Sequence, residues 1–258
     1  MLTKLIKYEL SATARYLMPL YIVLAFLTFF TKFTLTISSN SKILLALSSI
    51  FYFLYIISII IVAVTTFLLI IMRFYKNLFT GEGYLMFTLP VKVHELINSK
   101  LIISILWAVL SILLCFSSLL FVIPSTTALS PNASSFTLST FYDMAVNYGM
   151  GKSVLLLLMA FMMLVYNILI FFASIAVGQS ISSNKVFGSL IAYIGIYTIC
   201  QMFSGMLIVV LMIFNIDVND ESLIITLVIT LGLLISTIGS TVFYTVIHHF
   251  LKKRLNLE

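Results

Sequence analysis

The side chains that could do chemistry in this sequence are few, and their spacing does not assemble a reaction centre. Cys115 and Cys200 each lie inside an apolar run and lack the spacing of a metal site or a disulfide framework. We expect both to be small, buried apolar residues. His248 and His249 are adjacent, so on a helix their side chains point about 100° apart and make poor joint metal ligands. We therefore expect neither a metal nor a cofactor on this chain.

Sequence motifs of common enzymes are also missing. The chain contains no G-x-x-x-x-G-K-[ST], no G-x-S-x-G and no H-E-x-x-H. It cannot hydrolyse ATP through a P-loop of its own, and we expect it not to be an enzyme. No Asp or Glu lies within the long apolar runs, which disfavours a proton-driven carrier, because such carriers use ionisable groups inside the membrane.

One charged segment could bind a water-soluble partner. It is RFYKNLFTGEGYLMFTLPVKVHELINSK, residues 73–100, set between two apolar runs. Glycines on both sides of Glu82 indicate a turn or a helix break, and Pro90 disfavours helix at the residue before it. Between them lies an apolar tetrapeptide, residues 84–87, which favours contact with a protein partner if it lies outside the bilayer. A return of the tetrapeptide into the membrane interface is an equal alternative.

The first fifteen residues, MLTKLIKYELSATAR, predict a basic amphipathic helix. One face carries Leu2, Leu5, Ile6 and Leu10, and the opposite face carries Lys4, Lys7 and Ser11. We expect residues 1–15 to lie in the inner membrane interface. Glu9 falls on the apolar face, so it either extends to water or pairs with a basic group elsewhere. In the second case Glu9 would be a latch that holds this helix against the charged segment.

The composition is that of an integral membrane protein. Hydrophobic residues make up 62% of the 258 residues and charged residues only 9%, whereas soluble domains contain about 25% charged residues. Spans are predicted near residues 17–37, 43–72, 101–123, 153–177, 187–214 and 222–247. Each should be a helix, because hydrocarbon leaves backbone groups no other partner. The sequence thus predicts an all-α protein, residues 1–258, with a single transmembrane domain of six helices.

The basic residues predict the orientation of this domain. With the N-terminus inside, eleven Lys and Arg residues face the cytoplasm and three face outward. Both termini and the loop 73–100 are then cytoplasmic, and the loop 124–152 is extracellular. Orientation explains the net charge of +6, so we expect lipid and no nucleic acid as a partner.

A few polar and small residues inside the spans have two interpretations. Asn167 and Gln201 either form hydrogen bonds between helices or line a translocation path. In the sixth span Gly232, Ser236 and Ser240 recur every four residues. This spacing favours close helix packing within the subunit, with a dimer seam as the alternative.

FYKNLFTGEGYLMFTLP, followed by SKL, resembles the intracellular loop of permease subunits of type-2 ATP-binding-cassette (ABC) exporters. The likeness is to the bacterial branch with small permeases. KLIKYEL near the N-terminus is similar to the opening of that family. The resemblance implies an N-terminal elbow helix and a cytoplasmic coupling helix between spans two and three that docks on a separate ATPase subunit. By position the coupling helix comprises Glu82, Gly83, Tyr84, Leu85, Met86, Phe87, Thr88 and Leu89.

The same resemblance implies a function and an assembly. Two permeases, as a homodimer or as a pair of related chains, would join two ATPase subunits, which bind the ATP and Mg²⁺. The exporter would move a hydrophobic or amphipathic substrate, such as a peptide, out across the bacterial cell membrane. The alternative is a membrane immunity or sensor protein that docks a cytoplasmic partner through the same loop without transporting anything.

Overall fold

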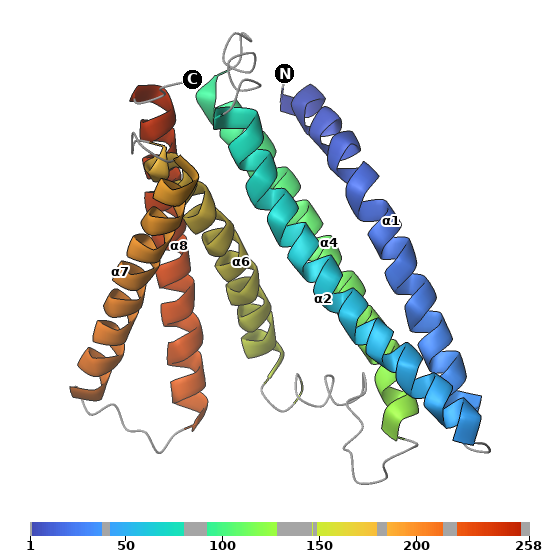
Figure 1. Ribbon diagram of the computed structural model, residues 1–258. Helices are drawn as coiled ribbons and strands as arrows, with labels where there is room; N and C mark the ends of the chain where they lie inside the picture. Colours follow the sequence, from blue (N-terminus) through green and yellow to red (C-terminus); the bar gives the residue numbers. More distant parts are fainter. Residues whose placement is uncertain are drawn as a thin grey trace. The chain divides into compact units, whose positions relative to one another are not determined.

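The computed structural model describes residues 2–37, 42–79, 92–127, 146, 149–179, 185–213 and 221–253. Within them the long helices are α1 (Leu2–Ile37), α2 (Lys42–Phe79), α4 (Val93–Thr127), α6 (Met150–Gly178), α7 (Lys185–Ile213) and α8 (Glu221–Lys253) (Figure 1). Each of these six is long and apolar enough to cross a membrane. The predicted all-helical fold with six helices long and apolar enough to span a membrane is therefore confirmed for the described residues.

Several helices continue well past the apolar runs that predicted them. Helix α2 has 38 residues, about 57 Å, whereas roughly 20 residues suffice to cross the hydrocarbon. No glycine or proline interrupts α2, so it extends through Arg73 and Lys76 to Phe79. The beginning of α4 and the end of α8 likewise contain charged residues. Helix geometry thus persists where the sequence turns from apolar to charged.

The predicted interfacial helix of residues 1–15 is not a separate element. Residues 2–37 form one continuous helix that contains Pro19. Buried side chains follow one face of α1 across the expected junction, from Glu9 and Thr13 to Leu17 and Leu24. These buried residues recur every three or four positions, so they share one face of α1. The same helix face is therefore buried both before and after residue 15, where the junction was expected. The first turns of α1 are therefore an extension of the first span.

The chain forms two compact units. The first, called here the α1 unit, contains α1 from Thr3, α2 up to Ile70 and the part of α4 that begins at Ile102. The second, called the α6–α8 unit, contains α6, α7 and α8 with the end of α2 from Ile71 and the start of α4 up to Leu101. Helices α2 and α4 thus contribute residues to both units.

In the α1 unit, α2 runs antiparallel to α1, and α4 runs antiparallel to α2 (Figure 1). The buried core of this unit contains Leu17, Tyr21, Leu24, Leu35, Tyr55, Val62, Ile103, Trp107 and Val122. The three helices also form side-chain hydrogen bonds with one another. Tyr21 Oη and Thr66 Oγ1 lie 2.6 and 2.9 Å from Ser111 Oγ, so one serine joins all three helices. Trp107 Nε1 donates to Thr13 Oγ1 over 2.7 Å, a second bond between α1 and α4.

In the α6–α8 unit, α6 packs against both α7 and α8. Helices α6 and α7 meet at the end where Gly178 lies and diverge toward the other end (Figure 1). A Cβ atom on Gly178 would overlap the backbone of Ser189, so only glycine allows α6 and α7 to approach this closely.

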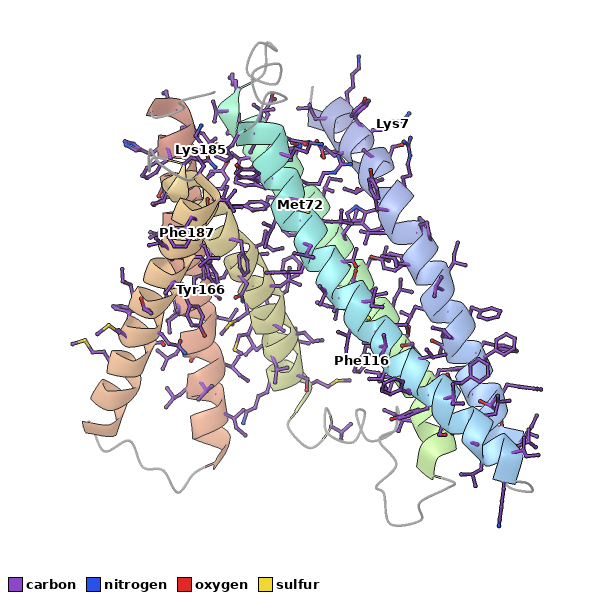
Figure 2. The ribbon with its side chains drawn as sticks, in the orientation of Figure 1. Lys7, Met72, Phe116, Tyr166, Lys185 and Phe187 are labelled. Carbon is purple, nitrogen blue, oxygen red and sulfur yellow. The ribbon has the colours of Figure 1, made fainter. Side chains whose placement is uncertain are left out.

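The small residues of α8 face α6. A Cβ on Gly232 would lie 2.8 Å from Met159 Sδ, and one on Gly239 would overlap the ring of Tyr166, labelled in Figure 2. Ser236 in the same helix is almost completely buried. These contacts confirm the prediction that the small residues of the sixth span pack within the subunit.

Candidate functional site at the charged helix ends

The predicted coupling helix, residues 82–89, lies outside the described residues, so its helical form and its docking role stay predictions. The structure does describe the two helices that flank it. Helix α2 ends at Phe79 and α4 begins at Val93. Whatever binds the segment between them acts first on these two helix ends.

The last turns of α2 are anchored in the α6–α8 unit. Phe74 and Leu78 are at most 1% exposed. The ring of Phe74 stacks on that of Phe172 in α6, with centroids 3.8 Å apart and planes 6° from parallel. A displacement of the α2 end therefore acts directly on α6.

The first turns of α4 are anchored in the same unit. Leu96 and Ile97 are at most 1% exposed. Tyr244 of α8 donates its hydroxyl proton to Asn98 Oδ1 over 3.0 Å. Ile247, one turn further along α8, is completely buried. The end of α2 thus contacts α6, and the start of α4 is joined to α8 by a hydrogen bond.

Basic residues dominate this end of the α6–α8 unit. They are Arg73, Lys76, Lys92, Lys100, Lys185 and Lys252, whereas Glu95 is the acidic residue among the described helix ends here. Lys100 is only 4% exposed and lies beside the buried Ser99. The exposed members of this set, Lys76, Lys92 and Lys252, suit an acidic partner or anionic headgroups.

Comparison with protein-family models, with curated proteins and with solved structures finds no match.

Glu9 is enclosed by protein, because only 4% of its surface is exposed. Its backbone carbonyl accepts a hydrogen bond from Thr13 Oγ1 over 2.7 Å, and the same Thr13 oxygen accepts the bond from Trp107. Of the two alternatives for Glu9, burial favours contact with another protein group over extension to water. Its pairing with a base of the charged segment stays a prediction.

Asn167 and Gln201 are both exposed. The structure does not bring their side chains together. Asn167 in α6 donates from Nδ2 to the carbonyl oxygen of Met163 in its own helix over 2.8 Å. No hydrogen bond joins the Asn167 and Gln201 side chains, both of which the structure describes. Their shared role in a translocation path stays a prediction.

Sequence reasoning missed the hydroxyl groups that join the helices of the α1 unit. Ser104, Ser111 and Ser118 of α4 recur every seven residues, and all three are buried. Besides the Ser111 bonds, Ser118 Oγ lies 3.0 Å from Tyr55 Oη. The seven-residue repeat is visible in the sequence and could have indicated one polar face of α4.

No potential metal centre appears in the part of the chain that the structure describes, where His, Cys, Asp and Glu do not gather in groups of three or more. Cys115 and Cys200 are free thiols of intermediate burial.

Proposed function

We propose that this chain is the membrane-spanning permease subunit of an ATP-driven ABC exporter. A separate ATPase subunit binds residues 82–89 from the cytoplasm and supplies the ATP and Mg²⁺ chemistry. The permease carries a hydrophobic or amphipathic substrate outward across a bacterial cell membrane. Both chain termini lie on the cytoplasmic side with the ATPase.

The proposal is supported above all by the anchoring of the two helices that flank the docking segment. Phe74 contacts Phe172 of α6, and Asn98 accepts a hydrogen bond from Tyr244 of α8. A loop whose two ends are tightly packed transmits displacement, whereas a loosely attached loop would absorb it. A partner that moves residues 80–91 would therefore displace the ends of α6 and α8.

In the proposed cycle this subunit performs no covalent step. ATP binding and hydrolysis on the partner shift the permease between inward-facing and outward-facing packings. The energy passes through residues 82–89 into α2 and α4. The first turns of α1 extend the first span, and in this proposal their Lys4 and Lys7 lie near the anionic headgroups.

The basic helix ends support the proposed orientation. Lys and Arg accumulate on the cytoplasmic side of membrane proteins. Six such residues lie at the end of the α6–α8 unit from which the docking segment leaves. A cytoplasmic ATPase would approach this end.

The docking assignment is tested by combining Tyr84→Ser, Leu85→Ser and Phe87→Ser. The chain is produced with a candidate ABC ATPase subunit, purified in lipid, and assayed for co-purification and ATP hydrolysis. We expect the triple serine variant to lose the ATPase while its helical content is unchanged, because the docking surface loses its apolar side chains. The matched control combines Tyr84→Phe, Leu85→Met and Phe87→Leu, which keeps the segment apolar and should retain the ATPase.

Co-purification that is unchanged in the serine variant would reject the docking role of residues 82–89. ATP-dependent export by liposomes containing the complex then separates an exporter from the immunity or sensor alternative. Docking of the ATPase without any export would favour that alternative.

A further inference from the structure

Among the described residues of the six spans, those of α7 have the smallest buried share. Of its most apolar stretch of 18 residues, only 6% is buried, whereas the corresponding share is 17–33% in the other five spans. Phe187 on this helix, labelled in Figure 2, is 63% exposed. An apolar surface of this kind is covered either by lipid or by another protein span.

One side chain on this surface is unsuited to lipid. Gln201 is exposed and lies at the middle of the apolar run 187–214. Asn167 of α6 satisfies its amide with a carbonyl of its own helix. The Gln201 carboxamide, in contrast, makes no hydrogen bond within the described part of the chain. Hydrocarbon offers no partner to such a group, so its exposure to lipid is unfavourable.

A second copy of this chain is the partner that best fits this group. A carboxamide carries both a donor and an acceptor, so two identical ones facing each other across a twofold axis can exchange two hydrogen bonds. Gly205 lies one turn beyond Gln201, and a Cβ there would meet nothing within 4 Å. A small residue beside a polar one allows two helices to approach closely. The small residues of α8 do not compete for this role, because Met159 and Tyr166 already cover them.

We propose that α7 is the contact helix of a homodimer and that Gln201 pairs with Gln201 of the partner subunit. The proposed function requires two permease subunits without specifying the second. This inference rests on that function only for the number of subunits, and it selects a second copy of the same chain. The partner copy supplies the hydrogen bonds that the subunit alone lacks.

Disulfide crosslinking in native membranes tests the proposed contact between the α7 helices of two subunits. Cys115 and Cys200 are first replaced by alanine in the full-length chain, and Gln201→Cys is then introduced. Oxidation with copper phenanthroline should give a covalent dimer, because residues on the twofold axis bring their Cα atoms within the roughly 7 Å that a disulfide requires. The matched control is Ile199→Cys. Residue 199 is 68% exposed and lies at similar depth, but it points about 200° around the helix from residue 201, so it should stay monomeric.

Equal crosslinking at both positions would indicate random collision and overturn the proposal. Absence of the dimer for Gln201→Cys would overturn it as well. If that cysteine instead reacts with a water-soluble maleimide, Gln201 belongs to the translocation path.

A second measurement determines how strongly the pairing of Gln201 with Gln201 stabilises the dimer. Gln201→Leu should raise the dimer dissociation constant in detergent by roughly 3- to 20-fold, the range expected for one or two hydrogen bonds between membrane helices. Gln201→Asn, which keeps the carboxamide, should raise it less. A dissociation constant that Gln201→Leu leaves unchanged would count against the seam. Neither readout needs the ATPase, so loss of the dimer and loss of docking at residues 82–89 are distinguishable failures.

Discussion

At the scale of single residues, the hydroxyl groups of the α1 unit hold helices together inside an apolar environment. Ser111 of α4 shares hydrogen bonds with Tyr21 of α1 and Thr66 of α2. Ser117 of the same helix is exposed and donates only to the carbonyl of Leu114 in its own turn. Two serines six residues apart therefore have different structural roles.

Ser111→Ala should destabilise the protein by about 1–3 kcal/mol, because two bonds between membrane helices are lost and each contributes roughly 0.6–1.7 kcal/mol. Ser117→Ala should change the free energy of unfolding by less than about 0.5 kcal/mol. Unfolding in mixed detergent micelles, followed by circular dichroism, measures both. Equal losses of stability in the two variants would show that the bonds of Ser111 add nothing to the fold.

The polar residues illustrate what the sequence could and could not predict at this scale. The amides Asn167 and Gln201 were recognisable, because an amide in an apolar run is rare. Serine and tyrosine are common in membrane helices, so their individual positions carried little signal. Whether a hydroxyl bonds its own helix, as Ser117 does, or a neighbour, as Ser111 does, depends on packing that one sequence does not reveal.

At the scale of elements, the crossing of α6 and α7 depends on one glycine. A side chain on Gly178 would meet the backbone of Ser189, which cannot move away as a flexible side chain can. At Gly195 in α7, by comparison, an added Cβ atom would have nothing within 4 Å. The two helical glycines thus differ in whether an added methyl group finds space.

Gly178→Ala should destabilise the protein by about 1–3 kcal/mol through overpacking, because α6 and α7 must separate. Gly195→Ala should be neutral or stabilise it by up to about 1 kcal/mol, since alanine favours helix over glycine. Thermal denaturation of the purified variants checks the difference. A neutral Gly178→Ala would mean that the close approach of α6 and α7 is not required.

The elements themselves were largely predictable, and their ends were not. All six predicted spans correspond to helices, and the fourth, near 153–177, matches α6 (Met150–Gly178) within a few residues. Hydropathy measures how apolar a stretch of residues is, whereas a helix ends where its backbone hydrogen bonds stop. For this reason α1 begins at Leu2 instead of near residue 17, and the amphipathic start of the chain is part of α1 instead of a separate helix.

At the scale of the whole molecule, the orientation rests on the distribution of charge. Lys42 lies at the start of α2 and Lys252 near the end of α8, and both are exposed. The predicted topology places Lys42 outside and Lys252 in the cytoplasm.

Lys42→Cys in a cysteine-free chain should react with a membrane-impermeant maleimide in intact cells, because the predicted topology exposes it to the outer medium. Lys252→Cys should react only after the cells are permeabilised. Labelling of both variants after permeabilisation controls for reactivity. Labelling of Lys252→Cys in intact cells would reverse the orientation and place residues 82–89 out of reach of any cytoplasmic ATPase.

The length of α2 has a consequence for the kind of partner this protein can recruit. The helix continues for seven residues after Met72, which carries the chain about 10 Å further along the helix axis. A headgroup layer is only about 5–8 Å deep on each side of the bilayer. In the proposed orientation, the end of α2 at Phe79 therefore lies beyond the headgroup layer. A docking protein could arrive by free diffusion, without an amphipathic helix or lipid anchor of its own, and leave again without disturbing the bilayer.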